Sequence, residues 1–320
     1  MKQEIAQALD AIQVNINPTG MTILNVVLAF VMFGVALGIK PQTFIDVFKK
    51  PKSVILGILC QFVLLPMMTF FLTLLMKDWI SPMMGLGMIL VASCPGGNIS
   101  NFMSSLSKAN TELSVSLTAI STSVAFFMTP LNFALWGGQY LRHTHITTDL
   151  PTLEIPFMEI FTTVIILLGI PLVLGILCTR YLPKVSDKLR KPLQYLSIIF
   201  FIAMVVLAFR QNVDAFLACI KYIFLIVLIH NMLALLIGYV TSAAFRLPYK
   251  DRRTLTIETG IQNSGLGLVL LFNPAIFDPA IWANNGGMLI ITAWWGVWHI
   301  ISGLIVSGAF NLTDRIKAKK

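Results

Sequence analysis

The chain has 320 residues, of which 57% are hydrophobic and only 12% are charged, whereas soluble domains carry about a quarter charged residues. This composition excludes an ordinary soluble protein and predicts an all-α polytopic membrane protein. It also excludes a transmembrane β-barrel, because barrel strands alternate in hydrophobicity and the long apolar runs of this chain do not.

Apolar runs of about 20 residues span the hydrocarbon core of a membrane as helices. We predict nine crossings, at residues 21–39, 53–76, 82–107, 111–137, 156–180, 193–209, 215–245, 250–277 and 286–311. A polar loop is expected at 137–156, in the middle of the chain. No linker separates a second unit, so we expect one integral membrane domain over residues 1–320.

The formal net charge is +9, and its distribution indicates the orientation of the chain. With the N-terminus outside, the inner loops and the tail hold Lys40, Lys49, Lys50, Lys52, Lys108, Arg180, Lys184, Lys188, Arg190, Lys191, Arg246, Lys250, Arg252, Arg253 and residues 315–320. The outer loops hold little beyond Lys77, Arg142 and Arg210. By the positive-inside rule we expect the N-terminus outside and the C-terminus in the cytoplasm, in the inner (plasma) membrane. The positive charge therefore reflects membrane topology, and no nucleic-acid partner is expected.

The first interrupted span contains the sequence CPGGNISN at residues 94–101. Its proline lacks an amide donor and its two glycines loosen the backbone. Unsatisfied backbone groups in hydrocarbon cost several kcal/mol each, so a break of this kind must face protein or a wet cavity. Asn98, Ser100 and Asn101 follow as residue types that begin helices. The pattern predicts two half-helices, the second of which begins within this motif.

The second interrupted span contains TIETGIQNSGLGLVLL at residues 256–271. Glu258 is the one carboxylate predicted well inside a span, at a cost of roughly 2.5–3.5 kcal/mol; Asp251 is expected in a loop. The nearest base on the same segment, Arg253, is expected at the cytoplasmic edge. The expected partner of Glu258 is therefore a mobile cation, and hard cations prefer oxygen ligands.

Further oxygen donors lie on neighbouring spans. Ser114 and Thr118 are four residues apart and share one helix face, and Gln61 is an amide inside an apolar span. Isolated hydroxyls in membrane helices usually bond back to the helix, and His230 and His299 are each first interpreted as packing residues. Interrupted segments in both halves of a chain are nevertheless typical of a transporter binding site.

With the flanking sequences CQFVLLP, LPYKDRRTLTIE and VWHIISG, the two interrupted motifs resemble those of the bile acid:sodium symporter family over residues 21–311. The resemblance implies inverted repeats with two discontinuous crossing helices. It implies a core domain (about 53–137 and 215–311) and a panel domain (about 21–39 and 156–209). It also implies nine helices, without the extra first helix of many bacterial members, and sodium-coupled symport of an organic anion by alternating access.

The resemblance further implies two bound sodium ions and an anion site. The first ion would be held by Ser100, Asn101, Ser114, Thr118 and Glu258. The second ion would be held by Gln61, Glu258, Gln262 and the backbone carbonyls of Thr259 and Ile261. The anion, such as a bile acid, a steroid conjugate or a small carboxylate, would lie near Asn98, Ile99, Asn263, Ser264 and His299. Besides sodium and the anion, membrane lipid is the expected partner.

Three alternatives remain open at the level of sequence. A metalloid extruder would depend on the thiol of Cys94, next to the first break. An intramembrane enzyme would need Ser100 and His299 as nucleophile and base, but no activated-nucleophile motif surrounds them, so no enzyme is expected. A non-transporting sensor would bind the same anion.

Overall fold

The computed structural model describes residue 10 and residues 18–38, 51–97, 99–144, 155–210, 213–274, 276–278, 281–282 and 284–318. Of the residues singled out above, Asn98, Lys40, Lys49, Lys50 and the last two of the tail lie outside this part of the chain. Within it the chain is helical, and its one β feature is an isolated bridge between Gly96 and Gln262.

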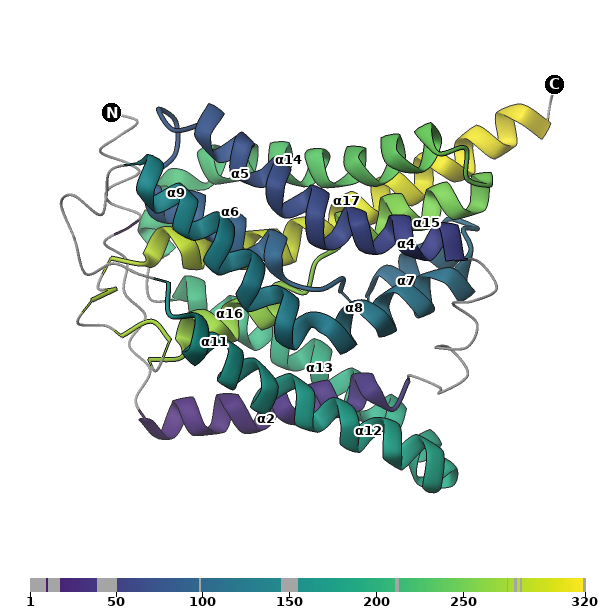
Figure 1. Cartoon of the computed structure of the whole chain (residues 1–320), viewed down its shortest axis with the longest axis horizontal. Coiled ribbons are helices and arrows are strands. Elements are labelled where there is room, and N and C mark those ends of the chain that lie inside the picture. Colours follow the sequence, from purple (N-terminus) through teal and green to yellow (C-terminus); the bar gives the residue numbers. More distant parts are fainter. Residues whose placement is uncertain are drawn as a thin grey trace.

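Helices correspond to each predicted span (Figure 1). In chain order they are α2 (Pro18–Ala36), α4 (Pro51–Leu59), the π-helical turn η2 (Cys60–Leu64), α5 (Leu65–Leu75), α6 (Pro82–Ser93), α7 (Ile99–Leu106), α8 (Thr111–Asn132), η3 (Phe133–Gly137), α9 (Gly138–His143), α11 (Phe157–Val164), η4 (Ile165–Gly169), α12 (Ile170–Tyr181), α13 (Pro183–Arg210), α14 (Val213–Ala244), α15 (Tyr249–Gly260), α16 (Ser264–Phe272) and α17 (Gly286–Ala318).

Three boundaries differ from the expected ones. The helix that begins at Thr111 continues through η3 and α9 to His143, so the loop expected from residue 137 begins later. Helix α13 begins at Pro183, ten residues before the predicted span, and α17 continues to Ala318. In each case a polar end extends an apolar helix, and hydropathy alone does not detect such an extension.

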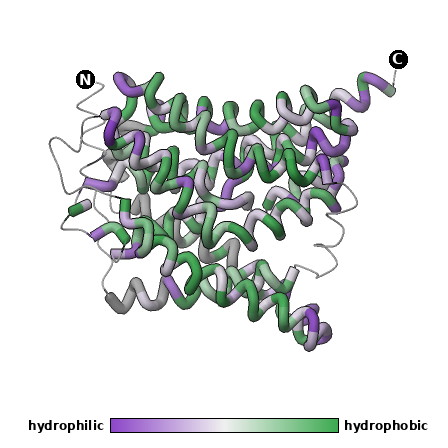
Figure 2. Tube along the Cα trace, viewed as in Figure 1, coloured by the Kyte–Doolittle hydropathy of each residue, from purple (hydrophilic) through white to green (hydrophobic). Residues whose placement is uncertain are grey.

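The chain is an all-α polytopic membrane protein. In the part that the structure describes, five helices are long and apolar enough to cross a membrane, including 51–75, 157–181 and 286–318. Hydrophobic residues cover the middle of the helices, and hydrophilic residues gather toward their ends (Figure 2). Large apolar side chains such as Phe71, Leu75 and Val240 are exposed, as lipid-facing positions require.

Helices α2, α12 and α13 contact one another and lie along one side of the molecule (Figure 1). They belong to the segments assigned to the panel domain, and that division remains a prediction. Helix α17 packs on α6, α14 and α16, and it also contacts α13. Leu86 of α6, Leu268 of α16 and Met288 of α17 belong to the same buried apolar cluster.

The two interrupted spans cross at their breaks. The first break separates α6 from α7, and the second separates α15 from α16. The amide of Gly97 donates to the carbonyl of Ile261 at 2.8 Å, and the amide of Asn263 donates to the carbonyl of Pro95 at 2.8 Å. Each break thus satisfies backbone groups that the other has freed, as burial requires.

Candidate functional site

The carboxylate of Glu258 lies at the end of α15, next to both breaks, and is 5% exposed. The hydroxyl of Ser100 on α7 donates to Oε1 at 2.6 Å. From α8, the hydroxyl of Ser114 donates to Oε1 and that of Thr118 to Oε2, the latter at 3.1 Å. Two helices, α7 and α8, therefore bring hydroxyl oxygens to one carboxylate on a third helix, α15.

The amide of Asn101 completes this oxygen cluster. Its Oδ1 accepts from the hydroxyl of Ser114 at 2.9 Å and from that of Thr118 at 3.4 Å. The hydroxyls of Ser100 and Thr118 are 3.3 Å apart. All five residues expected to surround the first ion are thus brought together, and we call them the oxygen cluster.

The oxygen cluster has the chemistry of a site for a hard monovalent cation. It offers one carboxylate, one amide carbonyl and three hydroxyls, which are ligands that hard cations accept. Among the described residues, no lysine or arginine pairs with Glu258. A buried ionised carboxylate requires a compensating positive charge, and a cation within the cluster would supply it.

A pair of glutamines lies beside the same crossing. Nε2 of Gln61 donates to Oε1 of Gln262 at 2.6 Å, and Nε2 of Gln262 approaches Oε1 of Gln61 at 3.2 Å. Gln61 also donates to the carbonyl of Cys94 at 2.9 Å, and Gln262 donates to that of Thr259 at 2.8 Å. These amides link the first break, the second break and η2.

The residues expected around the second ion are therefore only partly assembled. Gln61, Gln262 and the carbonyl of Thr259 share one network. The carbonyl of Ile261 already accepts from the amide of Gly97. Within the described part of the chain no hydrogen bond joins Glu258 to either glutamine. A second cation here would compete with the hydrogen bonds that pair the two amides.

Gln61 reaches the crossing from a π-helical turn. The turn η2 comprises Cys60–Leu64 and is followed by α5, whose second residue is Pro66. Proline lacks an amide hydrogen and perturbs the helical ladder before it, and π-turns occur frequently at functional sites. The sequence offered a signal for this irregular turn, because Pro66 follows Gln61 by five positions.

Of the described residues expected around the anion, two have structural contacts and two have buried polar atoms without a partner. The side chain of Asn263 caps α16, where its Oδ1 accepts from the amide of Leu266 at 3.1 Å. The hydroxyl of Ser264 and Nδ1 of His299 are buried and lack a partner in the structure. Buried polar atoms of this kind call for an explanation such as a ligand. Ile99 is half-buried and packs in a small apolar cluster with Ile261.

Two further residues named from the sequence have packing roles. The ring of His230 bonds the hydroxyl of Thr69 at 2.9 Å and lies 4.4 Å from the ring of Trp295. Cys94 is fully buried in the apolar cluster of α6 and α16. In the described residues no group of three or more His, Cys, Asp and Glu side chains is arranged to hold a metal ion.

Sequence reasoning missed three buried polar residues that fix these helices. Asp251, expected in a loop, lies in the first turn of α15, is 3% exposed, and accepts from Ser53 and Asn110 at 2.7 Å each. Arg253, expected at the cytoplasmic edge, is also buried within the protein. Asn231 donates to the carbonyl of Gly260, the last residue of α15, at 2.7 Å. In the sequence, the one indication of a structural role for Asn231 was the presence of an amide side chain within an apolar span.

Comparison with known proteins adds independent information. Residues 25–219 match a family model described as the Sodium Bile acid symporter family. The chain is 29% identical to the uncharacterized sodium-dependent transporter YocS of Bacillus subtilis (strain 168), over 85% of this chain and 82% of that protein. It is 30% identical to the probable chloroplastic sodium/metabolite cotransporter BASS1 of Arabidopsis thaliana, over 76% of this chain and 57% of that protein. It is 27% identical to the human ileal sodium/bile acid cotransporter, over 77% and 67% respectively.

Proposed function

Because the chain belongs to the sodium bile acid symporter family, we propose that it couples the movement of sodium ions to uptake of an organic anion. The single observation that carries this proposal is the oxygen cluster. Glu258 gathers hydroxyls from α7 and α8 at the crossing of two broken helices and has no basic partner in the described residues. A membrane protein retains a buried carboxylate of this kind chiefly for function.

Two sodium ions are proposed. The first binds the oxygen cluster, where it replaces the hydrogen bonds that the three hydroxyls now make to Glu258. The second binds Gln61, Glu258, Gln262 and the carbonyls of Thr259 and Ile261. The paired glutamine amides must first separate, so this site forms after a local rearrangement.

The anion is proposed to bind beside the crossing, near Asn98, Ile99, Asn263, Ser264 and His299. Helix α16 begins at Ser264, and the first amides of a helix favour negative charge. The unpartnered hydroxyl of Ser264 is a donor available to such a ligand, and Nδ1 of His299 is a second donor in the tautomer that carries its proton there. The substrate class is an organic anion such as a bile acid, a steroid conjugate or a small carboxylate.

Coupling follows from the shared backbone of the crossing. Sodium compensates the charge of Glu258 and fixes the positions of α7 and α15, whose breaks are hydrogen-bonded to each other. The same breaks carry the proposed anion contacts, so each ligand lowers the free energy of binding of the other, and this coupling is reciprocal. The core helices then move against the panel helices in alternating access. The membrane is proposed to be the inner (plasma) membrane, with the N-terminus outside.

A thermal-shift screen tests this function. The purified protein is heated with bile acids, steroid sulfates and small carboxylates, each in sodium and in potassium at equal ionic strength. A ligand that binds only the native state raises Tm, and the stabilisation grows with the logarithm of the ligand concentration above Kd. We expect at least one anion to raise Tm in sodium and not in potassium. Equal stabilisation in both salts would contradict coupling.

Two alternatives are separated from coupled transport by site variants in this screen and by a flux measurement. A thiol-dependent metalloid extruder would lose ligand stabilisation in Cys94→Ser and keep it in Glu258→Gln. The burial of Cys94 among apolar side chains argues against this alternative. A sensor would show sodium-dependent stabilisation but no flux in sealed vesicles.

A further inference from the structure

We propose that Arg253 is a positioning residue for the oxygen cluster, because it holds the far end of the short helix α7 against α15 and α17. The inference rests on the proposed function, since it concerns the site assigned to the first sodium ion. Arg253 does not itself contact an oxygen of the cluster.

Helix α7 needs support from outside. It comprises only eight residues, Ile99–Leu106, and helices this short are marginal on their own. It nevertheless carries Ser100 and Asn101, two of the five residues of the oxygen cluster, in its first turn. At its other end, the carbonyls of Met103, Ser104 and Ser105 accept from amides of the turn that follows. The contacts that Leu106 and Ser107 make with other helices therefore fix where this end of α7 lies.

Arg253 supplies the central partner. Its Nη1 donates to the carbonyl of Ser107 at 2.7 Å and to Oδ2 of Asp314 at 3.0 Å. Its Nη2 donates to the carbonyl of Phe310 at 3.2 Å and also pairs with Asp314. The guanidinium lies 4.4 Å from the ring centroid of Tyr249 and is 2% exposed. One side chain thus joins α15 to the end of α7 and to α17.

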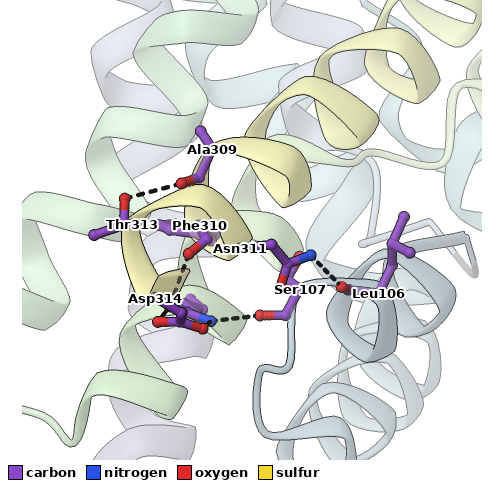
Figure 3. A network of polar contacts seen from close by, with 8 residues as sticks. Leu106, Ser107, Ala309, Phe310, Asn311, Thr313 and Asp314 are labelled. Atoms are coloured by element: carbon purple, nitrogen blue, oxygen red, sulfur yellow. Dashed lines mark hydrogen bonds and ion pairs between the residues drawn. The ribbon is translucent and has the colours of Figure 1, made fainter. Parts of the chain in front are cut away.

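Two direct contacts between α7 and α17 reinforce this junction. Figure 3 shows Leu106 and Ser107 facing Asn311 and Asp314 of α17. The side chain of Asn311 donates to the carbonyl of Leu106 at 2.9 Å, and the hydroxyl of Ser107 donates to that of Ser307 at 2.7 Å. The end of α7 is therefore held from two sides, by α15 and by α17.

Helices α7 and α15 are consequently joined at two points. At one, Ser100 bonds Glu258 at 2.6 Å, and at the other Arg253 bonds Ser107 at 2.7 Å. Arg253 precedes Glu258 by five residues on α15, a rise of about 7.5 Å. Loss of the second junction frees α7 to shift along α15, which moves Ser100 and Asn101 relative to the carboxylate. Supporting residues of metal sites typically alter metal affinity by about 10–100-fold when mutated.

The neighbouring arginine provides a matched control. Arg252 lies on the same helix, but its Nε donates to the carbonyl of Leu247 at 2.7 Å, immediately before α15. Within the described residues, no side-chain hydrogen bond or ion pair joins it to α7 or α17. Arg252→Lys therefore makes the same chemical change one position away without touching the junction.

The test compares Arg253→Lys with Arg252→Lys. Lysine keeps the positive charge but lacks the planar fork that bonds Ser107, Phe310 and Asp314 together. The readouts are the sodium concentration that produces a fixed rise of Tm without anion, and the anion KM at saturating sodium. We expect Arg253→Lys to require about tenfold more sodium, with the KM for the anion unchanged, and Arg252→Lys to match the wild type. An unchanged sodium requirement in Arg253→Lys, or an equal increase in both variants, overturns the proposal.

A covalent rescue separates positioning from general stability. The hydroxyls of Ser107 and Ser307 lie 2.7 Å apart, so Ser107→Cys with Ser307→Cys places two thiols where α7 meets α17. Oxidation of this pair in the Arg253→Lys background should restore the sodium requirement toward that of the wild type, and reduction should abolish the rescue. If the oxidised pair forms and the sodium requirement remains high, Arg253 acts by another route and the proposal fails.

Asp314→Asn gives a second test should Arg253→Lys fail to fold. Asp314 is 32% exposed and anchors the guanidinium from α17. Its amide variant should also raise the sodium requirement, by less than tenfold, because the bond from Arg253 to Ser107 remains. A sodium requirement that stays unchanged in Asp314→Asn contradicts the proposal. If the Tm of the wild type does not respond to sodium, the proposed function has failed. If the wild type responds and the variants need the same sodium concentration as the wild type, only this inference has failed.

Discussion

The hydroxyl of Ser100 and the carboxylate of Glu258 share a hydrogen bond of 2.6 Å across 158 positions of sequence. This bond joins the half-helix that follows the first break to the half-helix that precedes the second. Neither break positions the pair alone, because the backbones of the two breaks are bonded to each other. The crossing and the oxygen cluster are therefore one structural unit.

Replacement of Glu258 by glutamine should distinguish the free-energy cost of burying the carboxylate from its contribution to sodium binding. Glutamine keeps an oxygen acceptor for the three hydroxyls but cannot be ionised. Burial of an ionised carboxylate without a partner is costly, so Glu258→Gln without sodium should melt at a higher temperature than the wild type without sodium. It should also lose the sodium-induced rise in Tm. That rise in the wild type corresponds to about 2.7 kcal/mol at a hundredfold excess over Kd.

Glu112→Gln is the control for this variant, since Glu112 is exposed in the first turn of α8. It should retain the sodium-induced rise in Tm. Differential scanning fluorimetry in sodium and in potassium measures both variants. A rise that persists in Glu258→Gln would contradict the assignment of the carboxylate to sodium.

Ser114→Ala should weaken sodium binding without disrupting α8. The Ser114 hydroxyl donates to both Glu258 and Asn101, and hydrogen bonds to charged groups contribute about 1.5–3 kcal/mol. We expect the sodium requirement of uptake to rise about ten- to a hundredfold. Ser116→Ala is the matched control, because the Ser116 hydroxyl bonds only the carbonyl of Glu112 within its own helix, at 2.9 Å. Equal effects of the two substitutions in a sodium titration would exclude a specific role for Ser114.

Gly97→Ala should force the two breaks apart. A Cβ at Gly97 would lie 2.9 Å from the carbonyl oxygen of Gln262, and overpacking of this kind costs about 1–3 kcal/mol. The backbone dihedrals do not require glycine here, since no described glycine has a positive φ. Its role is close approach of the two chains. We expect a lower Tm and a loss of uptake.

Gly138→Ala provides the control for helix propensity and chain flexibility. A Cβ at Gly138 meets no atom within 4 Å, and alanine favours a helix by up to about 1 kcal/mol over glycine. Its Tm should equal or exceed that of the wild type, with normal uptake. If Gly97→Ala behaves in the same way, the crossing does not depend on close contact at this glycine.

Asp10 should make stability depend on pH. Burial raises the pKa of its carboxyl to about 7, against the hydrogen bonds from Ser81 and the amide of Met83. The folded pKa lies above the unfolded value of 3.8, so the folded state binds more protons between these values. Stability from this group is therefore full below about pH 4 and is lost as pH rises through about 7.

Asp10→Asn removes this proton equilibrium while it keeps an acceptor for Ser81. Between pH 6 and pH 8 the Tm of the wild type should fall more than that of Asp10→Asn. Asp78→Asn, at an exposed position, should follow the wild type. Parallel Tm profiles for the wild type and Asp10→Asn would show that burial of Asp10 does not govern this pH range.

The sequence predicted those features that depend on local pattern. Long apolar runs predicted the membrane helices, and Pro-Gly-Gly predicted the end of α6 at Ser93. The spacing of Ser114 and Thr118 placed both hydroxyls on one face, and the structure directs both to Glu258. The membership of the family was evident from the two motifs and is confirmed by the family match.

Tertiary pairing was not predictable from the same patterns. A hydropathy argument places Asp251 and Arg253 at an aqueous edge, because it assigns charged residues to water. In the folded chain the partners are Ser53 on α4, Asp314 on α17 and Asn110, which caps the start of α8, so both charges are buried. The pairing of Gln61 with Gln262 likewise depends on a contact across 201 positions.

The most direct test of sodium-coupled transport is uptake by proteoliposomes under an inward sodium gradient. The wild type, Glu258→Gln and Glu112→Gln are reconstituted at equal density, and uptake of an anion identified by thermal shift is followed with sodium or potassium outside. We predict accumulation above the equilibrium level in the wild type and in Glu112→Gln with sodium only, and none in Glu258→Gln. Accumulation by Glu258→Gln, or equal uptake in sodium and potassium by the wild type, would contradict the account.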